Sequence, residues 1–400
     1  MLSADACIDY LLGEARLLCT VEAVPTSEVL GRVLAETPVS TVNVPPLDNS
    51  AMDGYAVRLE DLSADATTLP ISQRIAAGQI GQPLQAGTAA RIFTGAPVPQ
   101  GADVVVMQEQ CDQHGDSVII NGQHRIGQNI RRAGEDLKRG DPILQPGSRL
   151  RPQDMGQAAS AGLATLPVYS RLKIAIFSTG DELINPGEAA APGQIYNSNR
   201  FTLMGLLGGL GAEIIDLGTC PDTLEATLGT LQQAASQADV IVTSGGVSVG
   251  EEDYIKAALD ELGEVAMWRV AMKPGKPLAY GRVGDTPFIG LPGNPVSTFV
   301  TFCLFARPFL LKSMGGSDVL PRRISVSAGF DSKRAGPRRE YVRARLEHID
   351  GKPTAIIYQH QGSGVLTSTV WADGIVILPE NTTINRGDSV EYISFEQLID

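Results

Sequence analysis

The 400-residue sequence has few of the side chains that bind soft metals or form disulfide bonds. Its five cysteines and four histidines are scattered, and no two cysteines form a C-x-x-C pair. An odd number of cysteines without such spacing argues against a disulfide framework and against a structural zinc site. Hard cations such as Mg²⁺, which prefer oxygen ligands, are not excluded.

Two nucleotide-binding signatures and any long apolar run are also missing. Neither G-x-G-x-x-G nor G-x-x-x-x-G-K-[ST] occurs, which disfavours dinucleotide-dependent enzymes and P-loop NTPases. The best apolar candidate, residues 299–311, is interrupted by Arg307 and Pro308 and is shorter than the ~18–20 residues of a membrane-spanning helix. The first residues are acidic where a secretion signal is basic, so we expect a cytoplasmic protein with no membrane partner.

Positive charge is in deficit. The formal net charge is −13, which gives the wrong long-range field for general binding to nucleic acid or to an anionic membrane. Residues 321–345 hold a local group of Arg and Lys, but only Phe330 and Tyr341 are aromatic among them, too few for an interleaved pattern. We interpret that group as a solvated face and expect no nucleic-acid partner.

The spacing of apolar residues changes along the chain. Residues 1–41 have apolar residues at helical spacing, and residues 69–145 have short apolar runs between Gly and Pro that indicate a β-rich module. From Arg171 strands alternate with helices, which predicts a parallel sheet covered on both faces, with ligands outside the carboxyl ends of its strands. After residue 320 the pattern predicts a small barrel or sandwich, with Arg343 on the exposed face of one strand.

The sharpest local feature is TSGGVSVGEEDY, residues 243–254. A strand enters it and a helix leaves it, and its glycines let backbone N–H groups approach an anion at the helix N-terminus. A plain tight turn is the simpler alternative. The segment also matches the G-x-S-x-G pattern of serine hydrolases. We disfavour that alternative because His348 and His360 lie in another predicted domain and no oxyanion loop precedes the segment.

Carboxylates are expected at the same edge of the sheet. Glu182 ends the first strand in STGDEL, and Asp222 and Asp253 lie close to the starts of two helices. Converging carboxylates suit Mg²⁺. Helix capping is the alternative, above all for Asp222, because Glu225 follows it at the spacing of a capping box.

Two lysines lie on a stiff turn. VAMKPGKP carries Lys273 and Lys276, with Arg269 just upstream. Beside a glycine-rich anion cradle these cations predict a clamp for phosphate or another oxyanion. A solvated surface turn is the alternative.

Nine strings, in this order, spread from about residue 45 to residue 363: PPLDNSAMDGYAV, RIFTGAPVPQGADVVVMQE, NIRRAGEDL, FSTGDEL, GQIYNSN, SQADVIVTSGGVSVGEEDY, KPGKP, GLPGNPVS and HQGSG. Together they resemble the molybdopterin molybdenumtransferase family, which includes MoeA and the E-domain of gephyrin. Each string is modest evidence, but all nine in order make the resemblance specific.

The resemblance implies an α/β multidomain subunit in four parts. An elongated, helical N-terminal domain would comprise residues 1–42 and 142–170, and residues 43–141 would form an inserted β-rich domain. A molybdopterin-binding-like, three-layer α/β domain (171–317) and a C-terminal β-barrel (318–400) would follow. It also implies a homodimer whose cleft is shared between the α/β domain of one subunit and the N-terminal half of the other.

The reaction that the resemblance implies is the insertion of molybdate into adenylated molybdopterin, with release of AMP and molybdenum cofactor. Mg²⁺ is the implied cofactor, and adenylated molybdopterin and molybdate are the implied substrates. The residue pattern fits, because this chemistry needs a phosphate cradle, cations for molybdate and carboxylates for Mg²⁺. It needs no cysteine or histidine of the protein, since the substrate brings the sulfur.

Site roles follow from the resemblance motif by motif. Catalytic roles are implied for Asp53, Thr94, Asp136 and Glu182. Metal ligation is implied for Asp53, Glu182 and Asp222. Binding of the pterin substrate or molybdate is implied for Ser244, Gly245, Gly246, Ser248, Gly250, Asp253, Lys273, Lys276, Arg269, Arg131, Pro292, Pro295, Arg343 and Ser363. At Arg269 the family often has lysine, and arginine offers a planar fork in place of a point charge.

Two alternatives stay open within this resemblance. A molybdopterin adenylyltransferase would share the glycine-rich turn and the acidic edge but would consume ATP, and it normally lacks a long N-terminal half. A non-catalytic scaffold like the gephyrin E-domain is the other. The resemblance further suggests a molybdopterin adenylyltransferase and molybdoenzyme-maturation proteins as partners.

Overall fold

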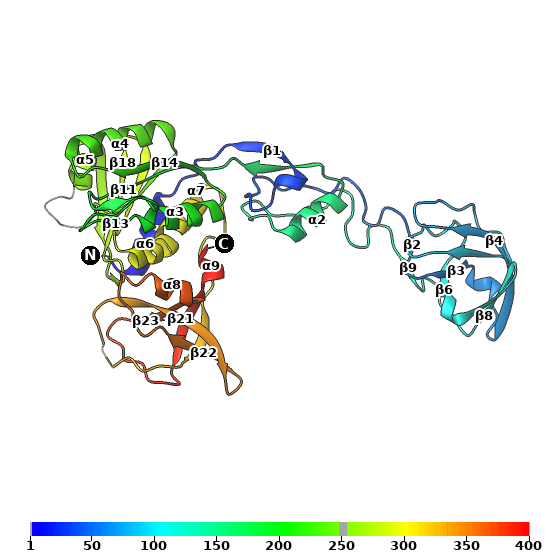
Figure 1. Ribbon diagram of the computed structural model, residues 1–400. Coiled ribbons are helices and arrows are strands. Elements are labelled where there is room, and N and C mark those ends of the chain that lie inside the picture. The colour runs from blue at the N-terminus through cyan, green and yellow to red at the C-terminus, as the bar shows by residue number, and fades with distance from the viewer. Residues whose placement is uncertain (1, 248–253, 334, 400) are drawn as a thin grey trace.

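The computed structural model describes residues 2–247, 254–333 and 335–399. Figure 1 shows an elongated molecule with a large body at one end, a small β unit at the other and a narrow arm between them. Both termini lie in the large body, so the chain runs out to the small unit and returns. In the arm, β1 (Val21–Pro25) pairs antiparallel with β10 (Thr165–Tyr169).

The large body contains a mixed sheet. Its strand order is β14 (Glu213–Cys220), β11 (Lys173–Thr179), β15 (Val240–Ser244), β19 (Thr286–Leu291), β18 (Pro277–Val283) and β16 (Gly263–Arg269). The prediction of a parallel sheet was wrong at β18, which runs antiparallel to both neighbours. The reason is local: β18 and β19 form a hairpin around Gly284, whose φ is +56°.

Helices cover both faces of this sheet, as predicted. Because side chains alternate along a strand, Ile174 and Ile176 of β11 enter one apolar core, whereas Ala175 and Phe177 enter the other. The first core is completed by helices α3 (Ser198–Gly209), α6 (Pro295–Thr301) and α7 (Arg307–Ser313), with the π-helical turn η4 (Phe302–Ala306) between the last two. The second is completed by helices α4 (Leu224–Gln237) and α5 (Tyr254–Leu262).

The continuous helical segment Pro295–Ser313 is long and apolar enough to cross a membrane, by length and composition alone. However, 89% of that window is buried inside the molecule. Its side chains form much of the first core, so the apolar run is explained as a core helix.

The first helix differs from the predicted domain division. Ser3 caps the N-terminus of helix α1 (Ala4–Glu14), and its side chain accepts a hydrogen bond from Ala6 N–H at 3.2 Å. Its buried face packs into the first core, and Lys312 Nζ donates to the Leu12 carbonyl at 2.7 Å. Residues 4–14 therefore lie in the α/β body rather than in the elongated N-terminal domain. That domain has its own core, around helix α2 (Pro152–Ser160) and β10.

The inserted unit is a small β domain, as predicted. Its strand order is β6 (Val104–Met107), β3 (Gly54–Val57), β5 (Ala89–Ile92), β4 (Ala66–Ile75), β8 (Ser117–Asn121) and β7 (Cys111–His114). A short pair, β2 (Asn49–Ser50) and β9 (Ile130–Arg131), lies where the arm enters it. The 3₁₀ turns of the N-terminal half are η1 (Thr26–Glu28), η2 (Leu59–Asp61) and η3 (Gln108–Gln110).

The C-terminal part is a barrel, one of the two predicted architectures. Its strands are β20 (Ile324–Ala328), β21 (Arg339–Ile349), β22 (Lys352–Ile357), β23 (Gly374–Leu378) and β24 (Ser389–Ser394), and pairing of β21 with β23 closes the ring. Helices α8 (Thr367–Trp371) and α9 (Phe395–Ile399) flank it. Strand β17 (Met272–Lys273), from the α/β domain, pairs with the start of β21 and joins the two domains.

Candidate functional site

A cavity of about 820 Å³ opens at the carboxyl ends of the parallel strands. Its walls come from the turns that follow β11, β15 and β19, from the KPGKP turn, and from the barrel. The position agrees with the rule for open α/β sheets. The predicted residues that line it are Glu182, Asp222, Ser244, Gly245, Gly246, Lys273, Lys276, Pro292, Pro295 and Ser363.

The glycine-rich turn requires glycine for steric reasons. Gly245 has φ +90°, and a Cβ there would lie 2.8 Å from the Thr179 carbonyl oxygen. Gly246 has φ +64°, and its Cβ would lie 2.7 Å from Thr179 Oγ1. A side chain at either position would collide with Thr179, so this tight turn takes only glycine, and both glycines line the cavity. The predicted residues Ser248, Gly250 and Asp253 lie outside the described part of the chain.

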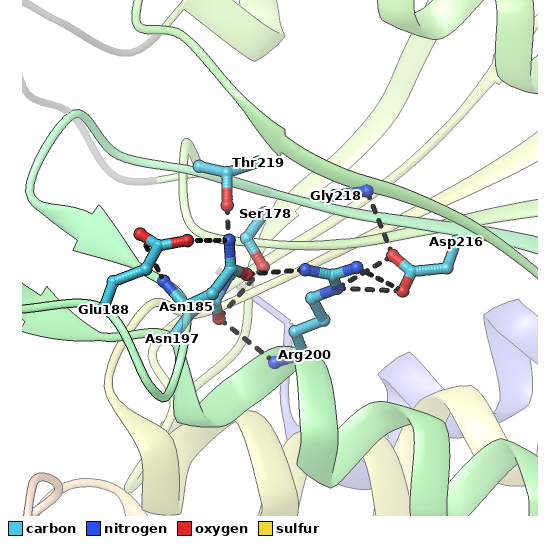
Figure 2. Close-up of polar contacts among 8 residues, drawn as sticks. All are labelled: Ser178, Asn185, Glu188, Asn197, Arg200, Asp216, Gly218 and Thr219. Carbon is cyan, nitrogen blue, oxygen red and sulfur yellow. Dashed lines mark hydrogen bonds and ion pairs between the residues drawn. The ribbon is translucent and has the colours of Figure 1, made fainter.

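A polar network joins Ser178, Asn197, Arg200 and Asp216 (Figure 2), and it reaches the cavity through Ser244, which lines it. Ser244, which is 2% exposed, has its Oγ 3.1 Å from Ser178 Oγ, and Ser178 Oγ donates to Asn197 Oδ1 at 3.4 Å. The Ser244 hydroxyl is thus bonded inside the protein, and we assign Ser244 the role of holding the turn in position. Arg200 N–H donates to Asn197 Oδ1 at 3.1 Å, and its guanidinium donates to both carboxylate oxygens of Asp216 at 2.6–2.9 Å.

This network ties β11, α3 and β14 together beneath the site. The sequence analysis missed Arg200, although its place directly after the motif GQIYNSN was an available signal. Its bidentate pairing with Asp216 fixes the guanidinium plane, and therefore the first turn of α3.

Carboxylates occupy one side of the cavity. Glu182 and Asp222 both line it. Asp222 Oδ2 accepts from Asp181 N–H at 3.2 Å, and Asp181 Oδ1 accepts from Asp222 N–H at 3.1 Å. The prediction that Asp222 caps helix α4 was wrong: the N-cap is Thr223, whose Oγ1 accepts from Ala226 N–H at 3.2 Å. The Asp222 carboxylate is thereby held beside the TGDE turn.

Two lining carboxylates are a partial fit for Mg²⁺. Among the described residues, no group of three or more His, Cys, Asp or Glu is placed to hold a metal ion. Mg²⁺ is commonly bound by one or two carboxylates together with substrate phosphates and water. Glu182 and Asp222 fit that mode, in which the ion arrives with a phosphorylated ligand. Asp53, the third predicted ligand, is in the inserted unit.

Cations come from the opposite end of the sheet. The turn that carries them lies between β16 and β18, whereas Glu182 and Asp222 follow β11 and β14. Lys273 and Lys276 project from the turn around Gly275, whose φ is +99°. Arg338, which the sequence analysis did not select, also lines the cavity and donates from Nη1 to the Met272 carbonyl at 3.3 Å. Within the described chain Lys276 has no carboxylate partner, so it is available to an anion. Arg269 is exposed on β16 and is not among the residues that line the cavity.

Arg343 is buried, which corrects the prediction of an exposed position. The residue is 1% exposed, although Arg345, two positions further on, is exposed. Arg343 Nε donates to Ser368 Oγ at 3.0 Å, and Nη2 donates to the Gly362 carbonyl at 3.1 Å. Burial lowers the pKa of its guanidinium to about 10, and no carboxylate among the described residues pairs with it.

Arg343 does not itself line the cavity and acts on it through the loop of residues 361–363. The side chain of Gln361 pairs with the Arg343 backbone in both directions, accepting from its N–H at 3.0 Å and donating to its carbonyl at 2.9 Å. Gln361, Gly362 and Ser363 line the cavity, and the Ser363 carbonyl accepts from Val296 N–H on α6 at 2.9 Å. Arg343 is therefore a positioning residue for this wall.

Four predicted residues lie in the inserted unit or at its base. The carboxylate of Asp53, which directly precedes β3, accepts from Thr94 N–H at 2.8 Å and from Thr94 Oγ1 at 2.7 Å. These bonds lower the pKa of Asp53. Arg131 is exposed on β9, and Asp136 is exposed beyond it. None of these residues lines the cavity, which lies in the large body at the other end of the arm.

Comparison with known proteins gives one consistent result. Three family descriptions match: "MoeA N-terminal region (domain I and II)" at residues 2–162, "Probable molybdopterin binding domain" at 175–312 and "MoeA C-terminal region (domain IV)" at 325–395. The chain is 38% identical to the molybdopterin molybdenumtransferase of Haemophilus influenzae over the full length of both. It is 40% identical to molybdopterin molybdenumtransferase 2 of Mycobacterium tuberculosis, over 93% of this chain and 94% of that one.

The solved structure of the molybdopterin biosynthesis MoeA protein from Pyrococcus horikoshii OT3 superposes with a TM-score of 0.85. It has 29% sequence identity and covers 98% of this chain and 100% of that one. This likeness confirms the fold class that the resemblance implied, a multidomain α/β protein.

Proposed function

Because the chain belongs to the molybdopterin molybdenumtransferase family, we propose that it inserts molybdate into adenylated molybdopterin and releases AMP and molybdenum cofactor. The names of its relatives place those proteins in molybdenum cofactor biosynthesis. The observation that carries the proposal is the division of the cavity into an acidic side, a cationic side and a glycine-rich turn. Adenylated molybdopterin is a phosphoanhydride and molybdate is a dianion, so the substrates present the complementary groups.

Each part of the cavity has a task in this reaction. The backbone of Gly245 and Gly246, which lines the cavity at the end of β15, holds the phosphates. Lys276 and Arg338 attract molybdate and hold its oxygens near the pterin. Bringing the two substrates together in fixed orientation is itself a large part of the rate enhancement.

Glu182 and Asp222 are the residues that would hold Mg²⁺. When bound, the ion supplies positive charge to phosphate oxygens while the bond to AMP breaks. With the ion on that side and the lysines on the other, the cavity neutralises both anionic substrates without requiring any protein thiol.

We further propose that the active unit is a homodimer. Asp53 and Thr94 form a preorganised carboxylate–hydroxyl pair, yet they are carried by the inserted unit at the far end of the arm from the cavity. If the inserted unit of a second copy covers the cavity, Asp53 joins Glu182 and Asp222. The cytoplasmic location and the two protein partners named above stay predictions.

The deciding experiment measures AMP release from adenylated molybdopterin, with Mg²⁺, in the presence and absence of molybdate. Release that depends on molybdate supports the transferase. Synthesis of adenylated molybdopterin from ATP would identify an adenylyltransferase instead. Absence of release from the folded protein would favour a scaffold.

A mixing experiment tests the shared cleft. Asp53→Ala and Lys276→Met homodimers should each be inactive, because every cleft lacks one group. After subunit exchange, half of the dimers are mixed and each has one intact cleft, so about a quarter of the wild-type activity should return. Activity that does not return after verified exchange would contradict the shared cleft.

A further inference from the structure

One cation of the cavity is already paired. Lys273 Nζ lies 3.0 Å from Glu340 Oε2, across the boundary between the α/β domain and the barrel. The Lys273 side chain is 50% exposed and that of Glu340 is 31% exposed. Lys273 lines the cavity and Lys276, on the same turn, has no such partner within the described chain. An anion that binds Lys273 must therefore compete with the Glu340 carboxylate, whereas an anion that binds Lys276 meets no such competitor within the described chain.

The position of Glu340 is fixed by the backbone on both sides. In β21 it pairs with Lys273 of β17 along one edge and with Leu378 of β23 along the other. Arg338 reinforces the first contact by donating to the Met272 carbonyl. This double pairing fixes the Glu340 backbone next to Lys273, so the carboxylate remains within side-chain reach of the ammonium when an anion enters.

We propose that Glu340 sets the affinity of the cavity for oxyanions by competing with the bound anion for the Lys273 ammonium. The inference rests on the proposed function in one respect, namely that this side of the cavity receives a tetrahedral oxyanion. Molybdate and the phosphate group of the pterin substrate share that chemistry. Glu340 thereby acts as an affinity-determining residue that touches neither substrate and weakens retention of any anion at this side.

The test is calorimetric titration of sodium molybdate and, separately, of inorganic phosphate into the full-length protein at fixed ionic strength. Glu340→Gln removes the competing charge and retains the side-chain shape. It should tighten anion binding by about two- to fivefold, the effect expected of an ion pair at this exposure. Tightening for molybdate, for phosphate or for both tells which anion reaches Lys273, and each supports the proposal.

A double-mutant cycle isolates the pair. Lys273→Met should weaken binding, and adding Glu340→Gln to Lys273→Met should bring no gain, since the cation over which the charges compete is gone. The matched control is Glu391→Gln, a barrel carboxylate that lies 3.2 Å from Arg323 and outside the cavity. It should leave both affinities unchanged.

Three results would overturn the proposal: Glu340→Gln binds no more tightly than wild type, the gain persists without Lys273, or Glu391→Gln gives the same gain. Thermal unfolding verifies that each variant is folded, and Glu340→Asp supplies a second test, since its shorter side chain should give an intermediate affinity. If the wild type and Lys276→Met bind neither anion, the cationic side of the proposed function fails together with this inference. If the wild type binds and Glu340→Gln matches it, this inference alone fails.

Discussion

The buried guanidinium of Arg343 allows a prediction that separates charge from packing. We consider Arg343→Met, which retains length and apolar volume, and Arg343→Lys, which retains a charge without the planar fork. In the wild type the guanidinium donates to Ser368 Oγ and to the Gly362 carbonyl, and it has no carboxylate partner in the described part of the chain. Two opposing contributions therefore decide the outcome.

The favourable contribution is two hydrogen bonds from a charged donor, worth about 1.5–3 kcal/mol each. The unfavourable one is burial of the charge. The pKa of Arg343 falls from its ordinary 12.5 to about 10, which corresponds to about 3 kcal/mol at about 1.4 kcal/mol per pKa unit. Arg343→Met loses both contributions, so we expect a net loss of about 0–3 kcal/mol. Arg343→Lys keeps the burial cost and loses the fork, so it should be the less stable variant.

Urea unfolding followed by circular dichroism measures these differences. Arg345→Met is the matched control, because Arg345 lies on the same strand, is exposed and has its guanidinium 4.6 Å from the Trp371 ring centroid. It should cost less than about 1 kcal/mol. Stability of Arg343→Lys equal to wild type, or above that of Arg343→Met, would refute the reasoning. Because Gln361–Ser363 form the cavity wall, Arg343→Met should also raise KM more than it lowers kcat.

Other predictions concern single features of the site. Gly245→Ala should cost about 1–3 kcal/mol by thermal unfolding, because the new Cβ meets the Thr179 carbonyl at 2.8 Å. Gly187 has φ +97°, but a Cβ there would meet open space, so Gly187→Ala should cost less stability than Gly245→Ala. Thr94→Val should raise the lowered pKa of Asp53 toward its ordinary value and move the acidic limb of the pH–rate profile to higher pH. The sign follows because Thr94 binds the ionised carboxylate, whose contribution is lost as pH falls through the Asp53 pKa; Thr94→Ser should restore the wild-type limb. Glu182→Gln should increase the Mg²⁺ concentration needed for half-maximal AMP release, and unchanged Mg²⁺ dependence would remove Glu182 from the metal site.

Several features of this protein were determined by the sequence alone. The strand–helix rhythm after Arg171 and the motifs at the strand ends were sufficient to predict the α/β domain and the edge where the cavity opens. The reason is local: a buried strand has a recognisable apolar run, and the turns that follow parallel strands meet at one edge of the sheet. The glycines at 245 and 246 and the lysines of KPGKP were found in this way.

Other features were decided by tertiary contacts. Period-two alternation predicted an exposed Arg343, but Ser368 of α8 and Gly362 of the preceding loop contact its guanidinium, which is buried. Helical spacing predicted helix over residues 1–41, which is correct for Ala4–Glu14 and wrong for Val21–Pro25, a strand. Nothing in the amphipathic pattern of α1 told which domain would bury its apolar face.

The pairing of Lys273 with Glu340 joins residues 67 positions apart. A charge pattern along the sequence does not reveal such a partner, because it depends on where β17 meets the barrel. Sequence periodicity describes which face of an element is apolar, whereas the partner that covers that face is selected by the packing of the whole chain.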